Sequence, residues 1–267
     1  MGATLIAEVE MTDHQIATER SPKRVRAIVN GETVADSLAP LLLLETNHSP
    51  VYYFPQADVR NDLLHPTSHH SHCPYKGDAC YWDIHVGGRS VENAAWSYRQ
   101  PVAAAACIHD HIAFYWDRID SWLEEDEEVF GHPRDPHHRI DVRSSAREVR
   151  VCFAGETIAV TRRGRFLFET GLPPRYYIPP EDVRTDLLVP TRTTSVCPYK
   201  GTAAYWLIKV GDRVAEDAVW AYHDPLPDAP PIGGHYCFYP EKVDSIEVER
   251  TALPERAADE ALAAANR

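Results

Sequence analysis

The chain has 267 residues, 44% of them apolar, which is long enough for one large domain or two small ones. Its 27 basic and 40 acidic side chains give a formal net charge of -13, which repels nucleic acid and anionic lipid. The longest aliphatic run, Leu41 to Leu44, is far shorter than the roughly 20 residues of a membrane span, and the N-terminus lacks a secretory pattern. We therefore expect a cytoplasmic protein that binds neither nucleic acid nor a membrane.

The first predicted element is a β-hairpin between Val25 and Val34. It is a run of β-forming residues interrupted by Asn30-Gly31, and Asn-Gly is the strongest short hairpin signal. Further strand-like segments follow at residues 51–54, 79–86, 91–98 and 111–116, with Gly87-Gly88 as the turn of a second hairpin. Short strands separated by turns, without sustained helical periodicity, predict a mainly β fold.

The second half of the chain repeats the first at a constant offset. The signature Cys-Pro-Tyr-Lys-Gly occurs at residues 73–77 and 197–201, so the offset is 197 − 73 = 124 residues. Glu45 matches Glu169 at this offset, and the copies align without insertion or deletion from about residue 25 to about residue 122. Equal loop lengths predict that both copies share one fold.

The repeat sets the expected domain organisation. We expect a first β module at 24–122, a linker at 123–147, a second β module at 148–248 and a C-terminal tail at 249–267. The linker assignment rests on an acidic run at 124–128 and on turn-forming residues at 131–136. The Ala- and Glu-rich tail favours a short helix.

Comparison of the copies reduces the six cysteines to two, because only Cys73 and Cys197 occupy matching positions. The six cysteines form no Cys-x-x-Cys pair, and their scattered positions favour reduced thiols. Lys76 and Lys200, three residues after each thiol, could lower its pKa by opposing charge. Each cysteine is therefore either a nucleophilic or redox thiol or a small buried side chain in a tight turn.

The same filter reduces fourteen histidines to His111 and His235. Each is either a general base beside the thiol or a hydrogen-bonded structural histidine. The tract of His65, His69, His70 and His72 resembles a metal-binding segment, but it is absent from the second copy. We assign no metal ligands and no cofactor to the chain.

Charged and aromatic side chains supply the remaining candidates for a ligand site. Arg60 and Asp62 recur as Arg184 and Asp186, either as a clamp that closes a turn or as a group that holds an anionic ligand. Aromatic side chains recur in matching strands and turns, either as core or as the wall of a pocket. These are Tyr75, Trp82 and Trp96 in the first copy and Tyr199, Trp206 and Trp220 in the second.

These motifs resemble those of domain-of-unknown-function family 427, which is labelled nucleotidyltransferase-like by name. The resemblance is carried by Tyr-Tyr-Ile-Pro at 176–179, Asp-Val-Arg-x-Asp-Leu-Leu at 182–188, the segment 194–206 around the signature and Trp-x-Tyr-x-x-Pro at 220–225. The first copy carries the same pattern and departs from it mainly at His69, His70 and His72. No Gly-Ser pair with spaced aspartates and no phosphate-binding glycine loop supports nucleotidyl transfer.

The resemblance implies a small β fold similar to the β-tent of methionine sulfoxide reductase B-type enzymes and of the drug-binding domain of cereblon. Those relatives hold zinc between two Cys-x-x-Cys knuckles, which this sequence lacks. We expect a small-molecule site in each module at the signature turn, with Cys73 and Cys197 as the thiols of a possible catalytic version. The alternative is a non-catalytic structural or protein-interaction module.

Overall fold

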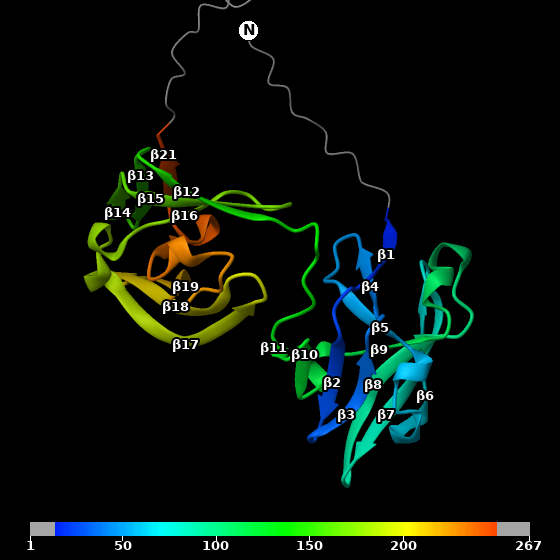
Figure 1. The fold of residues 1–267 in the computed structure, drawn as a ribbon. Coiled ribbons are helices and arrows are strands. Elements are labelled where there is room, and N and C mark those ends of the chain that lie inside the picture. The colour runs from blue at the N-terminus through cyan, green and yellow to red at the C-terminus, as the bar shows by residue number, and fades with distance from the viewer. Residues whose placement is uncertain (1–13, 250–267) are drawn as a thin grey trace, which may run out of the picture. The chain divides into compact units, whose positions relative to one another are not determined.

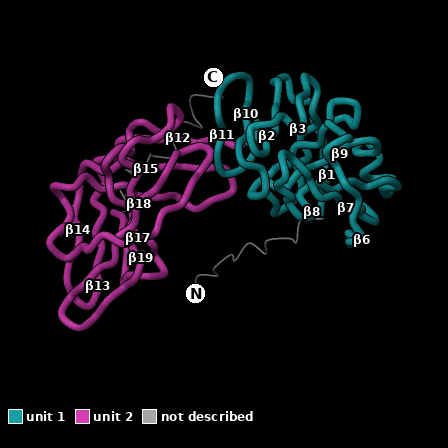
Figure 2. Tube along the Cα trace, turned by 90° about the horizontal axis from the view of Figure 1, so that it is seen from below, with its two compact units in different colours: residues 1–136 teal, residues 137–267 magenta. Residues whose placement is uncertain are grey.

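The computed structural model describes residues 14–249. The chain divides after Pro136 into two compact units (Figure 2), here called the first and the second module. Both are mainly β, and their strands follow one another at matching positions along the chain (Figure 1). Residues 250–267, where the sequence favours a helix, lie outside the described part. Within residues 14–249 no helix is long and apolar enough to cross a membrane.

The first module contains two antiparallel sheets. The wide sheet has the order β1 (Ile16–Arg20), β4 (Leu41–Glu45), β5 (Val51–Pro55), β9 (His111–Phe114), β8 (Arg89–Tyr98), β7 (Gly77–Val86), β6 (Leu64–Cys73). The narrow sheet has the order β11 (Glu127–Val129), β10 (Ser121–Glu124), β2 (Val25–Val29), β3 (Glu32–Ser37). Short 3₁₀ helices lie in the connections between strands: η1 (Gln56–Asp58), η2 (Asn61–Leu63), η3 (Ala103–Ile108) and η4 (Trp116–Arg118).

The second module repeats these pairings. The counterpart of the wide sheet is β12 (Ile140–Ser145), β15 (Gly164–Glu169) and β16 (Arg175–Tyr177), followed by β20 (Tyr236–Phe238), β19 (Arg213–Tyr222), β18 (Gly201–Val210) and β17 (Leu188–Cys197). A bridge between Ile178 and Tyr236 joins its two parts. The narrow sheet is β14 (Glu156–Thr161), β13 (Val149–Phe153) and β21 (Ser245–Val248), and the 3₁₀ helices are η5 (Pro180–Asp182), η6 (Thr185–Leu187), η7 (Pro230–Ile232) and η8 (Pro240–Lys242).

Turn chemistry explains the two predicted hairpins. Asn30 and Gly31 connect β2 to β3 with φ of 49° and 78°, the left-handed backbone that a two-residue hairpin turn requires. Gly87 and Gly88 connect β7 to β8 in the same way, with φ of 56° and 83°. Both expected hairpins and the mainly β fold are confirmed.

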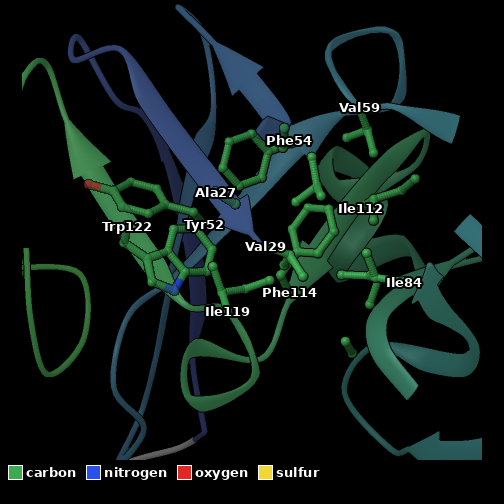
Figure 3. Close-up of a cluster of buried hydrophobic side chains, with 14 of the residues drawn as sticks. Ala27, Val29, Tyr52, Phe54, Val59, Ile84, Ile112, Phe114, Ile119 and Trp122 are labelled. Atoms are coloured by element: carbon green, nitrogen blue, oxygen red, sulfur yellow. The ribbon is translucent and has the colours of Figure 1, made fainter. Parts of the chain in front are cut away.

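Two apolar clusters lie on opposite faces of the wide sheet. The first fills the space between the two sheets, and Figure 3 shows Phe54, Ile112 and Phe114 close together beside Val29. The second contains Tyr53, Tyr81 and Tyr98 and is covered by η3 through Ala105 and Ile108. The side chains of β5 alternate between the clusters, Tyr52 and Phe54 to one and Tyr53 to the other, as the period of two along a strand requires.

The segment at 123–147, which the sequence assigns to a linker, contains β11 and β12. The acidic run forms the turn of the β10–β11 hairpin, with Glu125 at φ 52°. The carboxylate of Glu125 accepts a hydrogen bond from the backbone of Arg24 at 2.9 Å, and Arg26 pairs with Asp126 at 2.9 Å. Composition alone does not show this, because the basic partners lie 100 residues earlier in the chain.

Candidate functional site

The signature turn connects β6 to β7 in the first module and β17 to β18 in the second. Gly77 has φ +101°, and a Cβ atom there would lie 3.1 Å from the carbonyl oxygen of Gln100. Gly201 has φ +99° and faces the carbonyl of Asp224 at 3.3 Å. The turn therefore requires glycine because the backbone of a neighbouring segment lies against it.

The lysine of the signature forms a buried ion pair with a glutamate. Lys76 Nζ donates to Glu45 at the end of β4, and both side chains are about one-tenth exposed or less, at 11% and 6%. His14 lies 2.8 Å from the other carboxylate oxygen. Burial opposes ionisation of Glu45, but the hydrogen bonds from Lys76 and His14 outweigh it and hold the pKa of Glu45 below its usual value.

The second module repeats this trio of side chains. Lys200 Nζ lies 2.5 Å from Glu169, and His138 Nε2 lies 2.9 Å from the same carboxylate. In both copies the signature tyrosine covers the histidine. The rings of Tyr75 and His14 stack at 3.6 Å, and those of Tyr199 and His138 lie 4.4 Å apart. The signature thus joins three distant segments of each module.

A cavity of about 520 Å³ lies in the first module, with Glu45 and Lys76 in its wall. The β5–β9 ladder begins only at Tyr53 and Ala113, so Val51 and Tyr52 extend past it at the point where the cavity forms. Nine aromatic side chains line the cavity: Tyr52, Tyr53, Tyr81, Trp96, Tyr98, Phe114, Tyr115, Trp116 and Trp122. A space of this size and lining is typical of small-molecule sites.

Hydrogen bonds fix the polar ends of these aromatic side chains. The Trp96 indole donates to the hydroxyl of Tyr53 at 3.2 Å, and the hydroxyl of Tyr81 lies 2.7 Å from Ser71. Burial, followed by the hydrogen bond with Tyr81, raises the pKa of Tyr115 to about 12. The hydroxyl of Tyr115 therefore keeps its proton at physiological pH.

Cys73 and His111 lie outside the cavity lining. Cys73 is partly buried and packs against the apolar cluster of Tyr53, Tyr81 and Tyr98. His111 directs Nδ1 to the carbonyl of His109 at 2.7 Å. No hydrogen bond or ion pair joins Cys73 to His111 within residues 14–249, and the charge of Lys76 is engaged by Glu45.

The second copy gives the same picture for these candidates. Cys197 packs against the cluster that contains Tyr177 and Tyr222. His235 directs Nδ1 to the carbonyl of Gly233 at 2.9 Å, and Lys200 is paired with Glu169. The geometry therefore favours a structural use of the signature lysine over activation of the thiol.

The Arg-Asp pairs form clamps at the protein surface. The guanidinium of Arg60 donates twice to Asp62, at 2.8 and 2.7 Å, and Arg184 does the same to Asp186. Both partners of each pair are more than half exposed, and none lines the cavity. Each clamp closes the turn of η2 or η6.

The four tryptophans serve two different faces of the sheet. Trp82 and Trp206 pack against the clusters between the sheets. Trp96 lines the cavity, and Trp220, at the matching position, is buried and hydrogen-bonded to Tyr177 at 3.2 Å. Of these four predicted tryptophans, Trp96 alone lines the cavity.

The histidine tract lies on β6, an edge strand with its side chains exposed. His65 stacks on His85 at 3.9 Å, His69 lies against Tyr81, and His72 pairs with Asp78 at 2.6 Å. Within the described part of the chain, no three His, Cys, Asp or Glu side chains are grouped so that they could hold a metal ion.

Sequence reasoning missed the histidine of the trio and most of the cavity wall. His14 and His138 differ by 124 positions, so the repeat extends upstream of residue 25 and this offset could have identified them. The missed tyrosines recur as well: Tyr53, Tyr81, Tyr98 and Tyr115 match Tyr177, Tyr205, Tyr222 and Tyr239. Their recurrence at the repeat offset was the available signal.

Comparison with known families agrees with the repeat. The family described as Domain of unknown function (DUF427) matches the chain twice, at residues 17–125 and 141–249. The chain is a tandem member of the DUF427 family. The two DUF427 matches begin within β1 and at the second residue of β12, so each includes the first strand of its module. No curated protein matches the chain.

Proposed function

We propose that the first DUF427 module binds a small molecule in the aromatic cavity, and that the buried Lys76–Glu45 pair anchors the signature turn at its wall. The observation that supports this most directly is the cavity itself, about 520 Å³ in volume, with nine aromatic side chains beside one buried ion pair. Seven of those aromatic side chains recur in the second module, at Tyr176, Tyr177, Tyr205, Trp220, Tyr222, Phe238 and Tyr239.

The arrangement supports binding more than thiol catalysis. A nucleophilic cysteine needs a base within hydrogen-bond reach and an open approach for the substrate. Cys73 packs within an apolar cluster, and the hydrogen bond of His111 goes to a backbone carbonyl. The cytoplasmic location and the β-tent relationship stay predictions of the sequence and its resemblance.

The test is a fragment screen by NMR on the full chain. The chain has six tryptophans, so six indole N–H signals report on separate places in the molecule. We expect binding fragments to shift the Trp96 signal while the Trp82 signal stays in place, because Trp96 lines the cavity and Trp82 does not.

Two variants sharpen this test. Trp96→Phe removes the indole from the cavity wall, and Trp82→Phe makes the same change outside the cavity. Binding should weaken at least tenfold in Trp96→Phe and stay unchanged in Trp82→Phe. Fragment binding that maps elsewhere, or a diverse library that leaves the Trp96 signal unmoved, would contradict the proposal.

A further inference from the structure

One of the differences between the two modules lies in the cavity wall, at the start of β5. The first residue of β5 is Val51, and the matching first residue of β16 is Arg175. The guanidinium carbon of Arg175 lies 5.6 Å from the ring centre of Trp220 and 5.9 Å from that of Tyr239. Both distances fall within the range of a cation–π contact. The second module therefore holds a flat cation of its own against this aromatic pair.

The first module contains the same aromatic pair without that cation. Trp96 and Tyr115 lie 4.5 Å apart at 44°, and Trp220 and Tyr239 lie 4.3 Å apart at 41°. Val51 lines the cavity together with Trp96 and Tyr115. The wall that contacts a guanidinium in one module thus faces the cavity in the other.

A second cation site near the same ring is filled in both modules. Arg118 lies 4.5 Å from the ring centre of Tyr115 and donates to the backbone carbonyls of Glu92 and Asn93. Lys242 occupies the matching place, 5.2 Å from Tyr239. Of the two cations against this aromatic pair in the second module, Arg175 is therefore the one whose matching position in the first module holds an apolar residue, Val51.

The charges around the cavity are compatible with a cationic ligand. Lys76 is neutralised by Glu45, and Asp117 adds a further carboxylate to the lining. Apart from its two histidines, His48 and His132, the lining therefore holds two carboxylates and one ammonium group.

We propose that the cavity of the first module binds a ligand through a guanidinium or similarly flat cationic group placed against Trp96 and Tyr115. Arg175 fills the corresponding place in the second module, so that module occludes its own site. This inference rests on the proposed small-molecule function and adds the chemical class of the ligand.

Phenylguanidine and phenylurea test the charge, because they have nearly the same shape and differ in net charge at neutral pH. Isothermal titration calorimetry on the full chain should give one site for phenylguanidinium, with an affinity at least tenfold higher than for phenylurea. The NMR signal of the Trp96 indole should shift in the same titration.

Reciprocal variants test the role of the single position. Val51→Arg should abolish phenylguanidinium binding, and Arg175→Val should raise the stoichiometry from one site to two. Val51→Arg copies a residue that the second module already holds at the matching position, and its folding is checked by thermal unfolding. Val102→Arg adds the same charge to the first module at an exposed place outside the cavity lining, and it should bind as the unchanged protein does.

The outcomes separate the two proposals. Equal binding of phenylurea and phenylguanidinium, both lost in Val51→Arg, would overturn the cationic ligand and leave the small-molecule site standing. A stoichiometry that stays at one in Arg175→Val would overturn self-occlusion. If neither compound moves the Trp96 signal and no fragment of the library does, both the site and the inference fail.

Discussion

Replacing Lys76 by methionine tests how strongly the signature turn depends on its buried ion pair. The substitution keeps the length of the side chain but leaves the Glu45 carboxylate, 6% exposed, without its ammonium partner. Removing one partner of a buried pair costs about 3–5 kcal/mol, because the other charge stays buried. The lysine side chain is 11% exposed, so we expect a cost at the lower end, about 3 kcal/mol.

The cost should appear as a lower melting temperature of the first module alone. For a module of this size 1 kcal/mol corresponds to about 4 °C, so Lys76→Met should lower the Tm of that module by about 12 °C. Differential scanning calorimetry of the full chain measures it, and Lys200→Met should act in the same way on the second module. Lys23→Met is the matched control, because the Lys23 side chain is 45% exposed in its pair with Glu124.

The pH dependence gives a second measurement of the same pair. The folded-state pKa of Glu45 lies below its ordinary value of 4.5, so its contribution to stability is fully present above about pH 4.5. That contribution is lost as the pH falls through the folded-state pKa. The gap in Tm between the unchanged protein and Lys76→Met should therefore narrow on acidification. A Tm loss under about 3 °C, or one equal to that of Lys23→Met, would refute the reasoning.

Three further predictions follow from single positions. In urea unfolding, Gly77→Ala should destabilise the first module more than Gly88→Ala. Both positions have positive φ, which costs alanine about 1–2 kcal/mol, but only at Gly77 does the added Cβ contact neighbouring backbone. Equal losses of stability would contradict this. Burial raises the pKa of Cys237 to about 12, so iodoacetamide at pH 8 should label the exposed Cys107 and leave Cys237 unmodified, as peptide mapping by mass spectrometry would show. Arg60→Ala should change neither Tm nor fragment binding, because its clamp is exposed and outside the cavity; weaker binding would reinstate it as a ligand group.

The fold was largely predictable because the same order of strand-forming and turn-forming residues occurs twice in the sequence. The turn residues Asn30-Gly31 and the equal loop lengths predicted hairpins and a shared fold, and both are confirmed. The first strand of each module was missed. Its pairing partner, β4 or β15, lies more than 20 residues further along the chain, so no local pattern marks it.

The candidate site was predictable only in part. Recurrence identified Lys76 and Trp96, but it also selected Cys73, His111 and Arg60, which lie outside the cavity lining. Recurrence preserves residues for packing and turn closure as well as for binding, and sequence alone does not separate these uses. Glu45, the partner of Lys76, lies 31 residues earlier at the end of β4, so the pairing could be recognised only in the structure.

The carboxylate of Glu45 also has a consequence for the order of folding. Its contacts with His14 and with Lys76 each close a loop of 31 residues, one upstream and one downstream in the chain. Closing either loop costs chain entropy. The Glu45 carboxylate forms both contacts, so it offsets the entropy cost of both loops. We expect the start of β1 and the signature turn to become ordered in one cooperative step, and loss of that charge to release both ends at once. His138, Glu169 and Lys200 have the same spacing, so the second module contains its own set of these contacts.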